Sequence, residues 1–266
     1  MFGTIDRPAT LGVTTTTLGP GPVWCWDRVN AVTVTLGTGE LSSPGDLAAL
    51  AGDRALALQA PDGTWEVIAF SQADLIADKT YRLSRLIRGL GGSEARASRQ
   101  LAAGAPVVLL DAALLPIASG PSALGSNGYW RVVASAYDYM HPTALALTTL
   151  AGGDALRPLA PVRTVATRTS AGVQFTFMRR GRINADSWDV ADIPLDESIE
   201  RYELDVLKAG VVVRTLNGTG SPVVLYPAAL ELADFGSAQT SLPIRLFQIS
   251  DAVGRGAAFD ATLGVN

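Results

Sequence analysis

A glycine-rich stretch in the first half of the chain could hold a nucleotide cofactor. The sequence Gly-Leu-Gly-Gly at 89–92 follows an expected strand (81–87) and precedes a short helical run (94–103). Asp111 comes about 20 residues after the glycines, where a dinucleotide-binding unit places the acidic group that holds the ribose. The first strand of such a unit is buried on both faces and nearly all apolar. This part of the chain instead carries three arginines, Arg82, Arg85 and Arg88. We therefore favour a structural glycine turn, and a nucleotide-dependent enzyme is the alternative.

A run of carboxylates in the second half is another group of residues that could do chemistry. Its members are Asp186, Asp189, Asp192, Asp196, Glu197 and Glu200. A glycosidase needs two carboxylates that face each other across a cleft, and a calcium loop needs alternating acidic ligands closed by a bidentate glutamate. The spacing of this run does not match the calcium pattern. Three arginines precede it, Arg179, Arg180 and Arg182. We therefore predict a salt-bridged surface rather than a catalytic pair.

The chain has one histidine and one cysteine, which limits metal and nucleophilic chemistry. A zinc site or a Ser-His-Asp triad would depend on His141, which lies before Pro142 and is expected in a loop or at a strand end. Cys25 permits no intrachain disulfide and is expected to be a small buried side chain. Its neighbours Trp24 and Trp26 could stack on sugar rings if exposed, but we expect buried tryptophans in a β core. We predict no catalytic, cofactor-binding or metal-binding residues.

The composition of the 266 residues argues against several classes of partner. Net charge is −4, and 17% of residues are charged, which gives no basic face for nucleic acid. Mean hydropathy is positive, yet no apolar run reaches the ~18 residues of a membrane span, so no stable membrane insertion is expected. The excess apolar surface is therefore expected to meet other protein. Nearly all basic residues are arginine. This bias is expected at protein interfaces, where arginine binds carboxylates and stacks on aromatic rings, and it is equally expected from the codon usage of a GC-rich genome.

Alternating apolar and polar residues predict a β-rich domain over 23–150, a barrel or sandwich. Strands are expected at 31–36, 55–60, 65–70, 81–87, 107–110, 129–133 and 144–147, with a short helix at 46–51. Residues 1–22 are rich in Thr and Gly-Pro and predict an extended arm. This arm either pairs with a neighbouring chain or an upstream domain, or is disordered. Residues 151–160 have the composition of a linker.

Residues 161–266 predict a second β domain. Strands are expected to begin at Pro161 and to cover 173–177, 202–207, 211–213, 244–249 and 259–263, with a helical patch at 228–233. The length and the strand spacing match a sandwich of seven strands. With the loop at 250–256, this half resembles a fibronectin type III module. The expected fold class is therefore all-β, with a barrel or sandwich followed by a fibronectin type III-like sandwich.

Two segments in the first half carry a more specific resemblance. Residues 81–94 read Tyr-Arg-Leu-Ser-Arg-Leu-Ile-Arg-Gly-Leu-Gly-Gly-Ser-Glu, and residues 103–111 read Ala-Gly-Ala-Pro-Val-Val-Leu-Leu-Asp. This order resembles the baseplate "megatron" or host-specificity proteins of siphophage tails and gene transfer agents. In those proteins Leu-Leu-Arg-Gly precedes Gly-Thr-Glu, and an Ala-Gly-x-x-Phe-Val-Leu-Leu-Asp strand follows. Ser93 stands here in place of the usual Thr and keeps the hydroxyl.

The second half is similar to the same family. The matching segments are Arg179–Arg182, Asp186–Trp188, Tyr202–Leu207 and Val253–Gly256. The resemblance covers about residues 30–264. Family members are usually far longer, with hub and TIM-barrel-like domains upstream. We therefore expect this chain to correspond to their distal, C-terminal part, either as a separately encoded product or as an excised piece.

The resemblance implies a structural role. It implies a virion component of the tail baseplate or central tail tip, made in the bacterial host cytoplasm, without enzyme activity and without a cofactor. It also implies a homotrimer in contact with hub and tail-tip proteins, and contact with a host receptor or glycan. The alternative from another class is a carbohydrate-binding accessory module of a secreted polysaccharide-degrading enzyme. A signal peptide and an exposed aromatic platform would favour that alternative, and residues 1–22 lack the basic start and apolar core of a signal.

Overall fold

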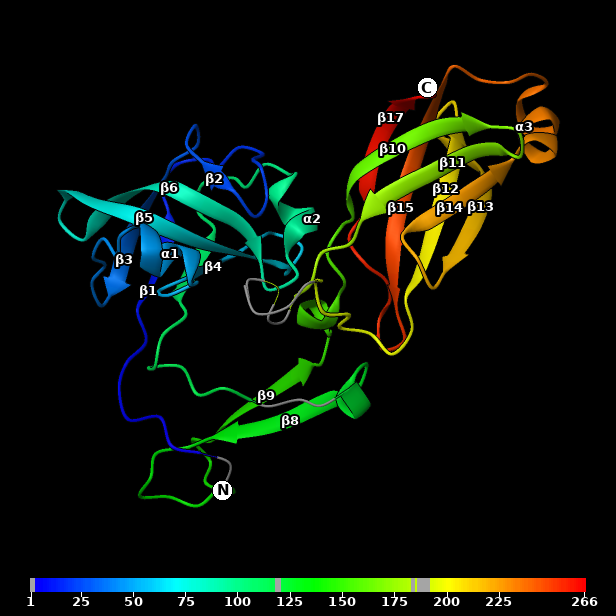
Figure 1. The fold of residues 1–266 in the computed structure, drawn as a ribbon. Helices are drawn as coiled ribbons and strands as arrows, with labels where there is room; N and C mark the ends of the chain where they lie inside the picture. Colours follow the sequence, from blue (N-terminus) through cyan, green and yellow to red (C-terminus); the bar gives the residue numbers. More distant parts are fainter. Residues whose placement is uncertain (1–2, 118–120, 183–184, 186–191) are drawn as a thin grey trace. The chain divides into compact units, whose positions relative to one another are not determined.

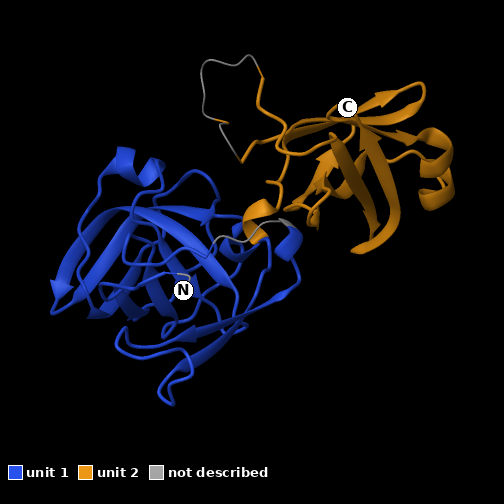
Figure 2. Ribbon diagram, turned by 90° about the horizontal axis from the view of Figure 1, so that it is seen from below, with its two compact units in different colours: residues 1–153 blue, residues 154–266 orange. Residues whose placement is uncertain are grey.

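The computed structural model describes residues 3–117, 121–182, 185 and 192–266 (Figure 1). The chain divides between Gly153 and Asp154 into two compact units (Figure 2), and each unit has its own hydrophobic core. This division falls inside 151–160, the segment whose composition predicts a linker. Most regular elements are β-strands, so the all-β prediction is confirmed. None of the helices within the described residues has the length and apolar character needed to cross a membrane.

The first unit is built on a closed ring of six antiparallel strands. These are β1 (Leu11–Thr14), β3 (Val32–Thr38), β4 (Leu56–Gln59), β5 (Trp65–Ala77), β6 (Thr80–Leu90) and β7 (Pro106–Leu109). The pairing order is β6-β3-β1-β7-β4-β5, and β5 pairs back onto β6. Closure leaves these strands without the open edges that invite aggregation. Three short elements flank the ring, namely β2 (Trp26–Asp27), α1 (Asp46–Leu50) and α2 (Glu94–Ala97).

The alternation of apolar and polar residues along a strand explains which face of it lies in the barrel interior. In β3, Val32, Val34 and Leu36 are buried, whereas the intervening threonines are only partly buried. Successive side chains of a strand point to opposite faces, so alternation places one valine-rich face in the core. Phe70 of β5 and Leu83 of β6 are fully buried in the same core.

The N-terminal segment differs from the arm expected for residues 1–22. Leu11–Thr14 form β1, which pairs with both β3 and β7 inside the barrel. Leu18 is buried and exchanges two backbone hydrogen bonds with Leu101. The sequence pattern does not reveal these pairings, because the edges of β3 and β7 that receive β1 are tertiary features. Residues 3–8 are exposed.

The hairpin of β5 and β6 is also longer than expected. The segment at 71–80, interpreted as a polar connection, continues both strands up to a tight turn at Asp78 and Lys79. Polar side chains pair across the two strands, where the Ser84 hydroxyl donates to the side-chain amide oxygen Oε1 of Gln72 at 3.1 Å. Exposed strand ends need no apolar alternation, so their polarity resembled that of a loop.

A fully buried arginine ties three segments of the barrel together. Arg88 donates through Nη2 to Oε2 of Glu66 at 2.9 Å and through Nε to Oε1 of the same carboxylate. Its Nη1 donates to the carbonyl of Gly19 at 3.0 Å and lies 3.5 Å from Oδ2 of Asp27. All three charged side chains are at least nine-tenths buried. We call Arg88, Glu66 and Asp27 the buried ion cluster.

Asp27 connects this cluster to the loop that follows β2. Its carboxylate accepts the backbone N–H of Val29 and of Asn30, and the side-chain amide of Asn30 donates to it at 2.7 Å. Burial raises the pKa of Asp27, but the hydrogen bonds from Asn30 and Val29 outweigh it and hold that pKa below its ordinary value. The cluster therefore orders residues 19–30 against β5 and β6.

The turn after Arg88 depends on two small residues. Gly89 has φ of +75°, and a Cβ there would lie 2.9 Å from Cγ1 of Val23 and 3.0 Å from Cα of Glu94, so only glycine fits without a shift. Ser93 precedes α2 but makes no capping hydrogen bond. Its hydroxyl instead accepts the N–H of Val67 at 2.9 Å and donates to the carbonyl of Leu90 at 2.7 Å. Ser93 therefore joins the turn to β5.

The last part of the first unit is a separate two-stranded sheet. After β7 the chain runs through a short 3₁₀ turn (Pro121–Ala123) into β8 (Asn127–Val132) and β9 (Leu145–Leu150). Within the described residues these two strands pair only with each other, and Figure 1 draws them apart from the barrel strands. We had expected these strands within the barrel or sandwich of 23–150.

The second unit is a sandwich of two antiparallel sheets. One sheet has the order β10 (Val162–Thr169), β11 (Gly172–Met178), β14 (Val223–Pro227). The other has β13 (Val211–Thr219), β12 (Arg201–Lys208) and β15 (Ser241–Ser250), with β16 (Gly254–Arg255) and β17 (Phe259–Gly264) both paired to β15. Helix α3 (Ala228–Phe235) connects β14 to β15. Phe177 and Tyr202 meet edge to face at 4.7 Å in the core. This arrangement agrees with the predicted fibronectin type III-like sandwich.

A charged anchor fixes α3 to this sandwich. Arg214 donates two hydrogen bonds to the carboxylate of Asp234, at 2.6 and 2.7 Å, and the Tyr226 hydroxyl donates a third at 2.7 Å. The hydrogen bond from Arg214, with help from Tyr226, lowers the pKa of Asp234 to about 2 against the opposing effect of burial. The anchor is therefore expected to weaken in acid.

Replacing Arg88 with methionine is expected to destabilise the first unit by about 3–5 kcal/mol, because two carboxylates would remain buried without their cation. Arg82→Met is the matched control, since Arg82 is exposed on the same strand, and its effect should stay within about 0.5 kcal/mol. Urea unfolding followed by tryptophan fluorescence measures both, because four of the five tryptophans lie in this unit. Equal losses in the two variants would contradict the assigned role.

Acid is expected to destabilise the second unit through Asp234. Its folded pKa of about 2 lies below the ordinary 3.8, so its contribution is complete above pH 3.8 and is lost as pH falls through about 2. Urea midpoints followed by circular dichroism over this pH range should therefore fall less steeply for Asp234→Asn than for the unchanged chain. Identical slopes would show that the anchor carries no such linkage.

Candidate functional site

The glycine-rich stretch does not form a nucleotide site. β6 and β7 are antiparallel barrel strands that do not pair with each other, and α2 between them has only four residues. A dinucleotide unit needs parallel strands joined by a helix whose N-terminus receives the phosphates. Asp111 is exposed, and its carboxylate accepts the N–H of Ala113 at 2.9 Å. The interpretation of Gly89–Gly92 as a structural turn is therefore supported, and the nucleotide-dependent alternative is dropped.

The described members of the carboxylate run are paired with arginines. Arg179 lies 2.9 Å from Asp192 and 3.5 Å from Glu200. Arg182 lies 2.7 Å from Glu197 and 3.7 Å from Asp196. These contacts agree with the predicted salt-bridged surface. Asp186, Asp189, Ser187 and Trp188 lie outside the described residues.

The arginine of the second glycine motif is also structural. Arg255 donates to Glu203 at 2.6 Å and to both carboxylate oxygens of Asp205 at 2.7 and 2.9 Å. Its guanidinium also lies 4.5 Å from the ring centre of Phe247. A Cβ on Gly256 would lie 2.6 Å from the carbonyl oxygen of Pro158. The motif at Val253–Gly256 therefore holds a strand and a neighbouring segment together.

The single cysteine and its neighbours are not buried as expected. Cys25 is exposed, and Trp24 is 41% exposed with φ of +57°. This backbone conformation, together with the short length of β2, turns the segment out of the barrel wall, so the strand alternation that we assumed does not apply. Trp26 is partly buried, with the Arg85 guanidinium 5.2 Å from its ring. His141 lies in a loop, as predicted, and stacks on Tyr137 at 3.9 Å.

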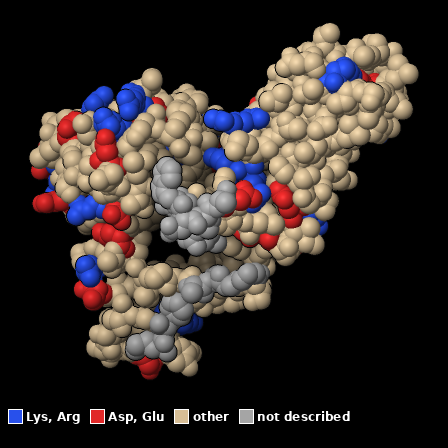
Figure 3. Space-filling view, viewed as in Figure 1, with Lys and Arg blue, Asp and Glu red and all other residues tan. Residues whose placement is uncertain are grey.

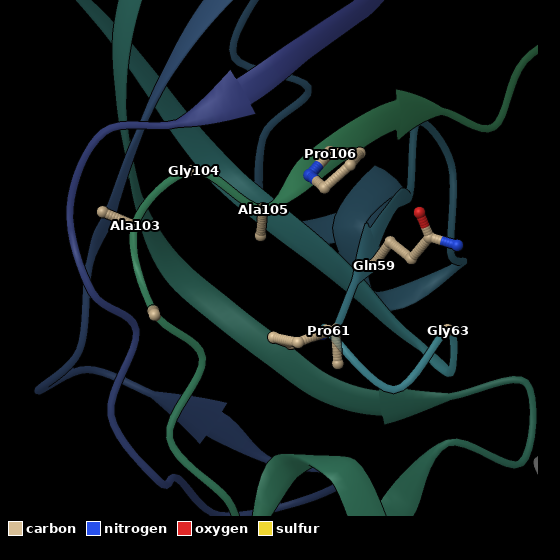
Figure 4. A pocket seen from close by; sticks show the side chains of 9 residues that line it. Gln59, Pro61, Gly63, Ala103, Gly104, Ala105 and Pro106 are labelled. Atoms are coloured by element: carbon tan, nitrogen blue, oxygen red, sulfur yellow. The ribbon is translucent and has the colours of Figure 1, made fainter.

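The hollows of the described surface offer little for catalysis. A pocket of about 290 Å³ is lined by Gln59–Pro61, Gly63 and Ala102–Pro106 (Figure 4), without an ionisable side chain. A second hollow of about 410 Å³ lies at the turn of the β5–β6 hairpin and includes Glu40, Asp78 and Lys79. Across the described residues, no group of three or more His, Cys, Asp or Glu residues could hold a metal ion.

The β8–β9 hairpin is the feature that these local roles leave unexplained. Its register sets Trp130 opposite Leu147 and Val132 opposite Leu145, so these four side chains share one face. We call them the apolar face. Val132, Leu145 and Leu147 are 41%, 57% and 43% exposed. Sequence alternation predicted the two strands but could not show how far Val132, Leu145 and Leu147 are exposed.

The other face and the loop of the hairpin have a different character. Tyr129 and Arg131 lie opposite Thr148 and Ala146 on the second face. Between Asp111 and Asp154 the sequence has only two charged residues, Arg131 and Asp138. Figure 3 accordingly shows few charged side chains over the lower part of the first unit. A surface with exposed apolar side chains and few charges is typical of a protein interaction site.

Comparison with known proteins supports part of the resemblance. Residues 9–108, which include the six barrel strands up to Val108 in β7, match the family model described as Rcc01698-like, C-terminal. No curated protein matches the chain. Among solved structures, the crystal structure of the rat CD45 extracellular region, domains d3–d4, is similar at 13% identity. That match covers 58% of this chain and 72% of the other, with a TM-score of 0.28. The barrel region is thus similar to the Rcc01698-like, C-terminal family.

Proposed function

We propose that this chain is a structural component of a phage or gene-transfer-agent tail, located at the baseplate or central tail tip. It assembles there with hub and tail-tip proteins, as a homotrimer, and contacts the host surface. The observation that carries this proposal is the exposure of Val132, Leu145 and Leu147 on one face of the β8–β9 hairpin, since apolar side chains leave water when they pack against neighbouring protein. The ordered motifs at 81–94 and 103–111 add the resemblance to tail proteins, and the family match at 9–108 covers the first motif and the second up to Val108.

The proposed role requires fitted surfaces rather than a reacting group. The arginines of both glycine motifs are engaged in ion pairs that hold strands together. In an assembly of several copies, weak surface contacts multiply because each bound site raises the effective concentration of the next. Host contact by several copies would therefore need no strong single site.

A carbohydrate-binding accessory module is the second candidate. The exposure of Trp24 favours it, because an exposed indole can stack on a sugar ring. Titration with soluble oligosaccharides, followed by tryptophan fluorescence of the unchanged chain and of Trp24→Ala, distinguishes this candidate. Binding that depends on Trp24 would support it.

Mass spectrometry of purified particles tests the virion assignment. Particles from the producing strain are fractionated on a density gradient, and peptides of this chain are quantified against those of the tail-tube subunit. We expect a fixed, low ratio across all particle fractions, because a component of the tip is present in a set number of copies. Particles from a strain that lacks the gene serve as the control. Absence of the chain, or a ratio that varies like a contaminant, would refute the assignment.

A further inference from the structure

We propose that the hollow at the turn of the β5–β6 hairpin binds an extended segment of a partner protein that carries an apolar side chain next to an arginine. The hollow has a volume of about 410 Å³ and is lined by Glu40, residues 75–79 and Tyr81. We call it the β5–β6 hollow. This inference rests on the proposed assembly role and names the chemistry of one partner. Three properties lead to it: a fixed turn, two exposed apolar side chains and an excess of negative charge.

The turn that forms the β5–β6 hollow is held against the barrel. The carbonyl of Lys79 accepts the backbone N–H of Leu36 in β3 at 2.9 Å. Tyr81 lies opposite Leu75 in the register of the hairpin, so these two side chains share one face. The side chain of Tyr81 is buried in the barrel core. The hollow is therefore formed before a partner arrives, and binding does not have to order it first.

A β-bulge brings two consecutive apolar side chains to this hollow. Leu75 pairs with Tyr81, and the next pair of the hairpin begins at Ala77, so Ile76 is an extra residue in β5. A bulge interrupts the regular alternation of a strand and redirects a side chain, and both Leu75 and Ile76 line the hollow. They are 64% and 56% exposed. An apolar side chain that packs against them would remove both from water.

The charges that line the hollow determine which partner fits it. Glu40 and Asp78 are exposed, and neither forms an ion pair within the described residues. Lys79 also lines the hollow, so two carboxylates and one ammonium leave a net charge of −1. This excess attracts a cation beside the apolar contact and repels the phosphates of nucleic acid. Arginine suits the site better than lysine, because its planar guanidinium can donate to carboxylates through several N–H groups. Carboxylates elsewhere in the chain, such as Asp205 and Glu231, are paired with arginine in this way.

Nuclear magnetic resonance of the isotope-labelled full chain tests this inference. The probe is the peptide Gly-Ser-Leu-Arg-Ser-Gly, blocked at both ends and titrated to millimolar concentrations while the backbone amide signals are followed. We expect saturable shifts at Ile76, Lys79 and Tyr81, because these residues line the hollow. A peptide with serine in place of leucine loses the apolar contact, and one with glutamate in place of arginine meets like charge. Neither should produce saturable shifts at these residues.

Two variants of the chain test the carboxylates of the hollow. The double variant Glu40→Gln with Asp78→Asn should weaken binding of the arginine peptide by roughly 5-fold or more, because its cation loses both carboxylates. Asparagine suits a turn position as aspartate does, so the hairpin should keep its conformation. Asp74→Asn is the matched control, since Asp74 is an exposed carboxylate of β5 that does not line the hollow. This variant should bind like the unchanged chain.

Absence of saturable shifts at the hollow with the arginine peptide would overturn the inference. Equal binding of the glutamate peptide, or equal affinities of the double variant and the control, would overturn it too. The comparison of peptides uses the unchanged chain, so it does not depend on the folding of a variant. Peptide binding with the chain absent from particles would refute the virion role alone. Presence in particles without peptide binding would refute this inference alone.

Discussion

The buried ion cluster is the constraint on which the first unit depends. A guanidinium that has lost all contact with water must be paired on every side, because an unpaired buried charge costs several kcal/mol. Arg88 therefore requires Glu66 of β5, Asp27 beside β2 and the carbonyl of Gly19 to converge. This requirement brings together segments that are distant in the sequence and holds residues 19–30 against β5 and β6. Arg88 also fixes the end of β6, where the turn at Gly89 begins.

An arginine held by carboxylates also occurs in the second unit. Arg255 is fixed by Glu203 and Asp205, much as Arg88 is fixed by Glu66. The Arg-Gly pairs at 88–89 and 255–256 thus have a structural role, because each arginine holds separate segments of its unit together. The exposed apolar side chains of the β8–β9 hairpin have no such structural role within the described residues.

Much of the fold was predictable because burial leaves a pattern in the sequence. The Val and Thr alternation at 31–36 predicted β3, and the apolar runs at 202–207 and 244–249 predicted the central strands of the sandwich. The failures arose where burial depends on distant partners. β1 looked like a loose arm because its neighbours in the barrel come from elsewhere in the chain, and Arg88 read as a polar residue because its carboxylates lie more than 20 residues away. The exposure of individual side chains was less predictable still. Whether Trp24 and the side chains of the β8–β9 hairpin are exposed depends on which distant segments pack against them, and the local sequence does not show this.

We propose that this protein works by packing against neighbouring proteins through the exposed apolar side chains of the β8–β9 hairpin. Hydrogen exchange of the backbone amides of β8 and β9, compared between dilute and concentrated solutions of the unchanged chain, tests it most directly. If association covers this face, exchange in the hairpin slows as concentration rises, while the barrel strands, already protected, change little. Exchange in the hairpin that stays fast at every concentration would contradict the account.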